Sequence, residues 1–278
     1  MTMRPTGSNT LHPAVALVTA GLGIALMIGA GLSLAPLLGR GGLEARNVLR
    51  AQIAIGSVLL ALPTLLVVPG LRGASWRSTL ALGNLPRRAL GLSILLGGAL
   101  WIGSIGLMEL QATAWPPAPE YLEAFRVIHR ALAPDGPFDA LVSVAVIALL
   151  PALTEELVVR GVLLPSLVKP LGPAGAVIAS AALFALMHDP YRYLFTLAVG
   201  LVFGLLRLYS GSLWPPIVAH FTLNTLTFLI APLVDDPSQT TYTPQPLLGV
   251  AALLAGTAFA LPLLRAFRRS VDGSQGPA

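Results

Sequence analysis

The sequence predicts an all-α fold, a polytopic membrane helical bundle of about eight transmembrane helices plus one interfacial amphipathic helix. Of the 278 residues, 55% are hydrophobic and only 10% are charged, whereas an ordinary soluble domain carries about a quarter charged residues. The mean hydropathy is +0.79. These observations indicate a chain that lies mostly within a lipid bilayer.

A membrane-spanning helix requires roughly 20 mainly apolar residues, and eight runs in the chain approach this length. They lie at about 14–38, 48–69, 89–110, 139–168, 173–188, 191–209, 214–233 and 246–266. The first run is too long for the core of a secretory signal peptide, so we interpret it as a spanning helix.

Between the third and fourth runs the sequence is amphipathic instead of uniformly apolar. Residues 119–132 place apolar side chains such as Tyr121, Leu122 and Phe125 at helical spacing, with charged residues between them. This pattern predicts a helix that lies in the membrane interface. We therefore expect three regions. These are N-terminal transmembrane helices with the interfacial helix in 1–135, a membrane core in 136–233, and a last transmembrane helix with a tail in 234–278.

The charge pattern indicates orientation and excludes several kinds of site. The net charge is +5, but the basic residues stand singly between apolar runs, which is not a nucleic-acid-binding pattern. Eight spans place both termini on one side, and 11 of the 17 Lys and Arg residues fall there. They are Arg4, Arg72, Arg77, Arg87, Arg88, Arg160, Lys169, Arg207, Arg265, Arg268 and Arg269. The positive-inside rule then predicts a multi-pass cell-membrane protein with cytoplasmic termini. The lack of cysteine excludes disulfides, thiolate zinc sites and a cysteine nucleophile.

One stretch, 154–160, places two carboxylates and a guanidinium inside an apolar run, where charges are costly. On a helix Glu156 and Arg160 share one face and can pair, while Glu155 points about 100° away. We therefore expect Glu156 and Arg160 to be structural and Glu155 to be chemical. If the helix continues to Val168, Glu155 lies about 20 Å from the cytoplasmic surface, close to the depth of His188. The sequence thus predicts Glu155 in the middle of a helix.

Two of the four histidines also lie inside apolar runs. His188 follows Phe184 by one helical turn, and His220 precedes Asn224 by one turn. A single buried histidine often only satisfies a backbone carbonyl, but this set together with Glu155 indicates one shared polar cavity. The other two histidines, His12 and His129, are expected at the interface or in solvent.

The chemistry of these side chains suits hydrolysis of a peptide bond by activated water. Glu155 can act as a general base when burial raises its pKa. A neutral imidazole can orient the water, bind a metal or stabilise an oxyanion, and the Asn224 amide is a neutral donor. The motifs H-E-x-x-H and G-x-S-x-G do not occur, which excludes a thermolysin-type zinc helix and a serine nucleophile elbow.

Three motifs occur in order: E-E-x-x-x-R at Glu155–Arg160, F-x-x-x-H at Phe184–His188 and H-x-x-x-N at His220–Asn224. Over about 140–230 this pattern resembles the CPBP family of intramembrane proteases. That family includes type II CAAX prenyl endopeptidases and bacteriocin-processing or self-immunity (Abi) proteins.

The resemblance implies roles for the matching positions. Glu155 would be the catalytic base, assisted by His188, with His220 and Asn224 forming the oxyanion pocket. Glu156, Arg160 and Phe184 would support them. The cofactor stays open: Glu155, His188 and His220 could bind Zn²⁺, and a metal-independent mechanism is equally compatible.

Three functions remain to be compared. The first is an intramembrane endopeptidase acting on membrane-associated or prenylated-type peptide substrates, with the lipid bilayer and a peptide or protein as its partners. The second is a proton-coupled transporter in which the same acids and histidines relay protons; the paired repeats typical of transporters are not evident in the sequence. The third is a non-catalytic immunity or scaffold protein, for which the complete motif set would be unnecessary.

Overall fold

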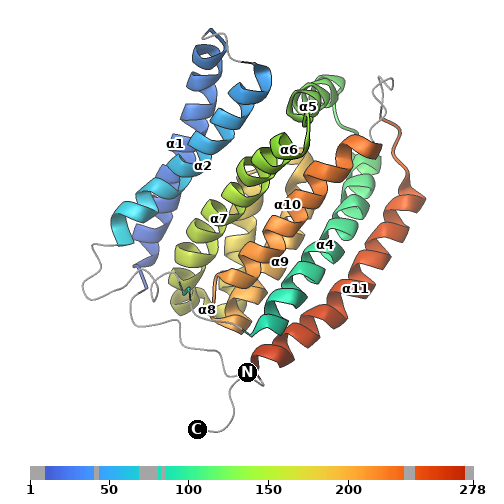
Figure 1. Cartoon of the computed structure of the whole chain (residues 1–278). Helices are drawn as coiled ribbons and strands as arrows, with labels where there is room; N and C mark the ends of the chain where they lie inside the picture. Colours follow the sequence, from blue (N-terminus) through green and yellow to red (C-terminus); the bar gives the residue numbers. More distant parts are fainter. Residues whose placement is uncertain (1–9, 41–43, 69–80, 83–85, 235–241, 273–278) are drawn as a thin grey trace.

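The computed structural model describes residues 10–40, 44–68, 81–82, 86–234 and 242–272. Every regular element in these ranges is helical, so the predicted all-α fold is confirmed (Figure 1). The elements are α1 (Pro13–Arg40), α2 (Ala45–Val67), α4 (Arg87–Ala114), α5 (Pro119–Leu132), α6 (Pro137–Ser143), η2 (Val144–Leu149), α7 (Leu150–Glu156), η3 (Leu157–Leu163), α8 (Leu164–Leu186), η4 (Pro190–Arg192), α9 (Tyr193–Ser210), α10 (Trp214–Val234) and α11 (Pro246–Asp272).

The elements from α6 to α8 follow one another without a loop, but the chain reverses direction within α8. Gly172 has φ 67° and ψ 169°, a conformation that suits glycine, and the neighbouring Pro173 has no N–H to continue a helix. Arg160 and Phe184 are 24 residues apart, so a straight helix would separate them by about 36 Å. The Arg160 guanidinium carbon instead lies 4.5 Å from the centre of the Phe184 ring. This segment therefore supplies two antiparallel passes.

Six segments in the described part of the chain are long and apolar enough to cross a membrane. They are Pro13–Leu34, Ala45–Val67, Arg87–Ala114, Pro137–Leu186, Pro190–Ser210 and Pro246–Asp272. Pro137–Leu186 counts as two passes because it reverses at Gly172, and α10 adds a further helix of 21 residues. The predicted bundle of about eight transmembrane helices is confirmed. Large apolar side chains such as Leu247 (86% exposed) and Phe138 (79% exposed) face outward, as expected for a lipid-facing surface.

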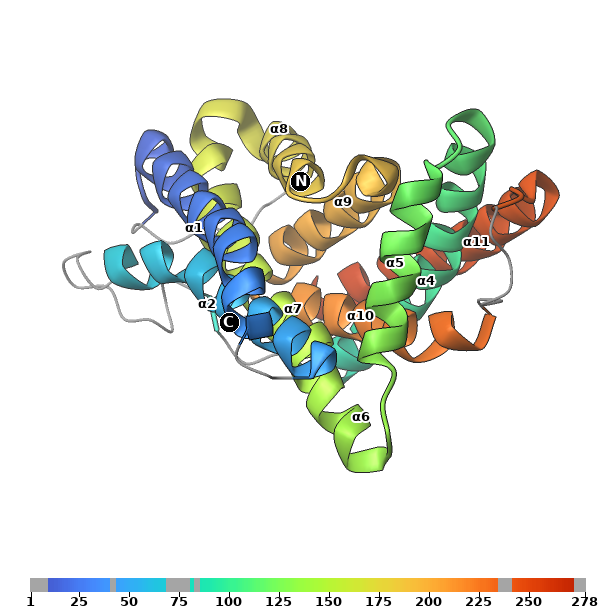
Figure 2. The ribbon, with the colours of Figure 1, turned by 90° about the horizontal axis from the view of Figure 1, so that it is seen from above.

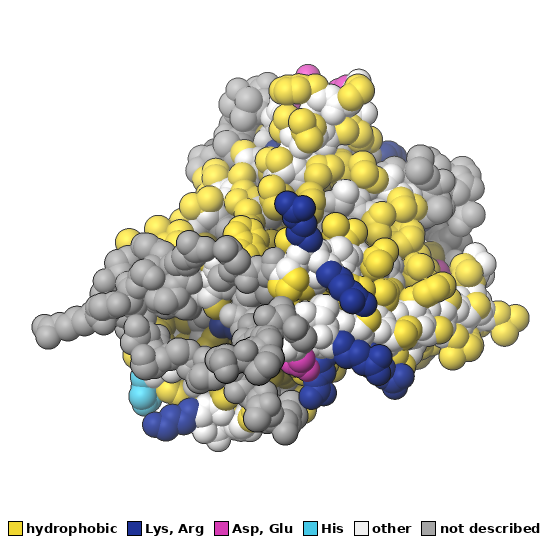
Figure 3. Space-filling view, turned by 60° about the horizontal axis from the view of Figure 1, so that its bottom comes forward, with side chains coloured by type: hydrophobic (Ala, Val, Ile, Leu, Met, Phe, Trp, Pro, Cys, Tyr) yellow, Lys and Arg dark blue, Asp and Glu magenta, His cyan; other side chains and the backbone are white. Residues whose placement is uncertain are grey.

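The predicted interfacial helix corresponds to α5, whose bounds are those expected from the sequence. Figures 1 and 2 show α5 lying across one end of the bundle, at a steep angle to the other helices. The opposite end, which Figure 3 brings forward, carries several Lys and Arg side chains among the hydrophobic side chains of the described residues. The orientation of the protein in the membrane stays a prediction, as do the three sequence-based regions.

Glycines allow α4 to pack closely against both α10 and α11. A Cβ added at Gly97 would lie 2.5 Å from the carbonyl oxygen of Ala219, and one added at Gly106 would lie 2.5 Å from the backbone nitrogen of Leu253. Small residues are the usual means by which membrane helices approach this closely. Because Ala219 precedes His220, the contact at Gly97 fixes the part of α10 that carries the candidate site.

Candidate active site

The pair predicted from the spacing of Glu156 and Arg160 is present, and both side chains are fully buried. Nη1 of Arg160 lies 3.0 Å from Oε1 of Glu156, and Nη2 donates to the carbonyl oxygen of Gly200 at 3.0 Å. The aromatic rings of Phe184 and Phe203 flank the guanidinium at 4.5 and 5.6 Å. Burial of a charge pair requires such additional partners. Arg160 therefore connects η3 to α8 and α9.

His220 reaches this pair from α10. Its Nδ1 lies 3.0 Å from Oε1 of Glu156. Because the same Oε1 accepts from Arg160 and a carboxylate only accepts hydrogen bonds, Nδ1–H is the donor. The proton on Nδ1 leaves Nε2 as an acceptor, as is usual for a neutral imidazole. Phe203 stacks on the ring at 5.1 Å, and Phe184 meets it edge-on at 5.8 Å.

Glu155 lies on the other side of the His220 ring. Its Oε2 is 3.9 Å from Nε2 of His220, a distance too long for a direct hydrogen bond. The same oxygen is buried and has no hydrogen-bond partner among the described residues. The predicted position of Glu155 within a helix is confirmed, because the helix continues beyond Val168 to the break at Gly172. The two adjacent glutamates thus face two different atoms of one imidazole.

His188 lies immediately beyond α8, near the same cluster. Its Nδ1 donates to the carbonyl oxygen of Phe184 at 2.9 Å, which leaves Nε2 free of a proton. The Phe184 ring lies 4.8 Å from the His188 ring and 5.8 Å from the His220 ring, edge-on to both. Phe184 therefore contacts both imidazoles and helps to fix the position of each.

Asn224 lies one turn after His220 on α10 and is half-buried. The hydrogen bonds of the described residues do not connect it to Glu155, His188 or His220. Its place in an oxyanion pocket stays a prediction.

The segment that holds these residues matches a known family. The model described as Type II CAAX prenyl endopeptidase Rce1-like matches residues 137–226, from the start of α6 into α10. Residues 137–226 are an Rce1-like domain. Searches of the curated proteins and of the solved structures returned no match. The match of this segment supports intramembrane protease activity in general, in a multi-pass membrane protein.

The Rce1-like domain brings two of the three predicted metal ligands face to face. Glu155 and His220 approach each other to 3.9 Å. Across the residues that the structure describes, no three His, Cys, Asp or Glu side chains are grouped so that they could hold a metal ion. The residues as arranged therefore do not fit the three-ligand Zn²⁺ site that the sequence left open.

Three residues of α9 that the sequence motifs do not include also surround Arg160 in the Rce1-like domain. Gly200 accepts from its guanidinium, Phe203 stacks beside it, and Arg207 donates from Nε to its backbone carbonyl at 3.2 Å. Their spacing, i, i+3 and i+7, places them on one face of the helix. Of these three residues, only Arg207 could have been noticed in the sequence, because it is a charged residue in an apolar run.

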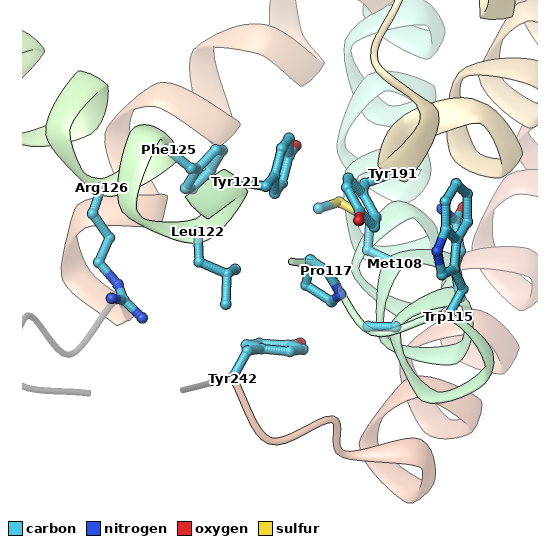
Figure 4. A pocket seen from close by; sticks show the side chains of 11 residues that line it. Met108, Trp115, Pro117, Tyr121, Leu122, Phe125, Arg126, Tyr191 and Tyr242 are labelled. Atoms are coloured by element: carbon cyan, nitrogen blue, oxygen red, sulfur yellow. The ribbon is translucent and has the colours of Figure 1, made fainter. Parts of the chain in front are cut away.

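A pocket of about 180 Å³ lies between the Rce1-like domain and the helices before and after it (Figure 4). It is lined by Met108, Gln111, Ala112, Trp115, Pro117, Tyr121, Leu122, Phe125, Arg126, Tyr191 and Tyr242. The lining combines the end of α4, one face of α5, the η4 turn and the segment before α11. Most of these side chains are aromatic or aliphatic, so the pocket favours an apolar group.

This pocket shares a wall with the turn that carries His188. Tyr191 follows His188 by three residues and packs against Trp115 and Tyr121, with ring centres 4.9 and 4.5 Å apart. The side-chain nitrogen of Gln111 donates to the carbonyl of Pro190 at 3.1 Å. Burial, with a contribution from Asp189, raises the pKa of Tyr121 to about 12. Its hydroxyl therefore stays protonated and able to donate a hydrogen bond at neutral pH.

Proposed function

We propose that the protein is an intramembrane endopeptidase in which Glu155 activates the hydrolytic water. The observation that carries this proposal is the arrangement around His220. Oε2 of Glu155, which has no protein hydrogen-bond partner among the described residues, faces Nε2 of an imidazole whose Nδ1 is held by Glu156. Two acceptors on either side of a 3.9 Å gap can together hold and polarise a water molecule.

In the proposed reaction, Glu155 accepts a proton from the water as its oxygen attacks the carbonyl carbon of the scissile bond. His220 Nε2 accepts the second water hydrogen as a hydrogen bond and orients the attack. As the C–N bond breaks, the proton on Glu155 passes to the leaving nitrogen. A general base of this kind contributes about 10²–10⁴-fold to the rate.

The remaining motif residues have supporting roles in this proposal. Glu156 and Arg160 fix the tautomer and the orientation of His220, and Phe184 holds both imidazoles in place. His188, with Nε2 free, assists from the side of the pocket. The Asn224 amide stabilises the oxyanion of the tetrahedral intermediate. In this proposal the Nδ1–H bond to Glu156 leaves Nε2 of His220 as an acceptor, so His220 orients the water in place of the oxyanion-pocket role that the family resemblance implied.

The substrate we propose is a membrane-associated peptide that carries a bulky apolar group, such as a prenylated-type peptide. Two observations support it. The pocket beside His188 is apolar and opens between membrane helices and α5, and the matching family model is described as a prenyl endopeptidase.

The proposal is tested by comparing peptides from membranes that contain the wild-type protein, the Glu155→Gln variant or the Glu120→Gln variant. Glu120 is an exposed carboxylate on α5 and serves as the matched control. We expect Glu155→Gln to lower cleavage by about 100-fold or more and Glu120→Gln to leave it unchanged. Undiminished cleavage by Glu155→Gln would contradict the assignment of Glu155 as the general base. Substrate-dependent proton uptake without cleavage would favour a transporter.

A further inference from the structure

Arg207 is a cation in the last turn of α9, and the family motifs do not include it. Its side chain is only 4% exposed, and within the described ranges no ion pair joins it to an acid. A charged side chain in a membrane helix is costly and is retained where it has a partner or a function. The partner of Arg207 is a backbone carbonyl, at 3.2 Å from its Nε.

That carbonyl belongs to Arg160, and the local backbone explains why it needs a donor. In an α-helix it would accept from the N–H of Leu164, but the π-helical register of η3 directs that N–H to the carbonyl of Val159. In the π register the next donor would be residue 165, which is a proline and has no N–H. The carbonyl of Arg160 is thus left without a partner inside its own helix, and a buried carbonyl in that state is unfavourable.

Arg207 supplies the missing donor from a neighbouring helix. The residue it holds is the one whose guanidinium binds Glu156 and the carbonyl of Gly200. Glu156 in turn fixes Nδ1 of His220. A chain of hydrogen bonds therefore runs from Nε of Arg207 through Arg160 and Glu156 to the imidazole that faces Glu155.

We propose that Arg207 is a positioning residue that holds the π-helical register of η3, and with it the orientation of His220 toward Glu155. The expected effect of Arg207 on cleavage rests on the proposed function. The role belongs to the N–H at the ε position and not to the positive charge. The π register of η3 leaves the carbonyl of Arg160 without a backbone donor, and Arg207 donates to that carbonyl.

Two substitutions separate the N–H from the charge. Arg207→Gln keeps a nitrogen donor at the same position along the side chain and removes the charge, whereas Arg207→Met removes the donor and keeps an extended apolar stem. We expect Arg207→Met to lower kcat about tenfold or more, since small misplacements of catalytic groups have effects of this size, with KM nearly unchanged. Arg207→Gln should stay close to the wild type in both constants.

A third variant tests the contact directly. Pro165→Ala introduces an N–H five residues after Arg160, where it can donate to the Arg160 carbonyl in the π register. Added to Arg207→Met, it should restore most of kcat, and a role in packing alone would not respond to this change. Lys169→Met, at an exposed cation of α8, is the control for loss of charge.

Each variant is also followed by its thermal unfolding midpoint in detergent, which does not depend on activity. If the wild type cleaves nothing, the proposed function fails, but the order of the unfolding midpoints still tests the contact. Arg207→Met should have the lowest midpoint. Arg207→Gln and the double variant Arg207→Met with Pro165→Ala should unfold near the wild-type midpoint. If Arg207→Met does not fold, recovery of folding in the double variant supports the inference. Wild-type behaviour of Arg207→Met, or equal defects in all three Arg207 variants, would overturn it.

Discussion

His220 bonds through Nδ1 to Oε1 of Glu156 at 3.0 Å, and its Nε2 lies 3.9 Å from Oε2 of Glu155. The two adjacent glutamates therefore act on opposite nitrogens of one ring. Glu156 holds the ring through a direct hydrogen bond, and Glu155 keeps an oxygen available to water. This division gives different expectations for substitutions at the two positions.

Glu156→Gln should destabilise the protein, whereas Glu155→Gln should not. Removal of one partner of a fully buried ion pair leaves Arg160 uncompensated and costs about 3–5 kcal/mol. Glu155 has no such bond to lose, so its variant should unfold at the wild-type temperature while cleavage is lost. Thermal unfolding in detergent gives the unfolding temperature of each variant. Equal unfolding temperatures for Glu156→Gln and the wild type would contradict the structural role of the pair.

Gly200→Ala should impair both stability and cleavage through Arg160. The added Cβ would lie 3.2 Å from Ala181 and 3.3 Å from Nη2 of Arg160, and overpacking of this kind costs about 1–3 kcal/mol. The matched control is Gly91→Ala in α4, where nothing lies within 4 Å of the new atom. That change should be neutral or stabilise by up to about 1 kcal/mol, since alanine is the better helix former. Similar unfolding temperatures for the two variants would argue against a tight contact at Gly200.

Phe125→Ala should weaken substrate binding more than it slows the chemical step. Phe125 lines the pocket beside the His188 turn, and loss of a large apolar contact there should raise KM about tenfold with kcat nearly unchanged. Val127, on the same helix, is 53% exposed and outside the lining, so Val127→Ala is the control. Cleavage kinetics with apolar peptide substrates give both constants. A fall in kcat at constant KM would place the apolar group of the substrate elsewhere.

Both termini should be cytoplasmic, and the absence of cysteine makes this simple to measure. Single cysteines at Lys169→Cys, near the Gly172 turn, and Arg130→Cys, on α5, are at exposed positions at opposite ends of the bundle. In intact cells a membrane-impermeant maleimide should label Arg130→Cys and should label Lys169→Cys only after permeabilisation. The reverse pattern would mean that the orientation is inverted. Two of the 11 basic residues counted on the cytoplasmic side, Arg160 and Arg207, are buried within the bundle, so this measurement carries more weight than the count.

The features that depend on local sequence were predictable. Apolar runs of membrane length and the helical spacing of Tyr121, Leu122 and Phe125 indicate the spanning helices and α5, because burial in lipid or at its surface follows from composition and period. The pair of Glu156 and Arg160 follows from a spacing of four residues on one helix.

The features that depend on packing between helices could not be predicted from the sequence. Glu155 and Glu156 are adjacent, and nothing in the sequence indicates that both approach one imidazole, that of His220, 64 residues after Glu156. This arrangement depends on the rotation of α10, which packs closely against α4 at Gly97. The link between Arg207 and Arg160 likewise depends on the π register of η3, for which Pro165 is only an indirect signal.

Gly172 lies 12 residues after Arg160 and 12 residues before Phe184, and these two side chains meet across the turn. The site is therefore sensitive to the length of the chain as well as to its side chains. Deletion of one residue from either arm would shift that arm by about 1.5 Å and rotate it by about 100°. Only removal of about one full turn, roughly 3.6 residues, from both arms together would keep Arg160 and Phe184 at the same depth and on facing sides of their helices. Substitutions between Gly161 and Leu183 are thus far easier to accommodate than insertions or deletions.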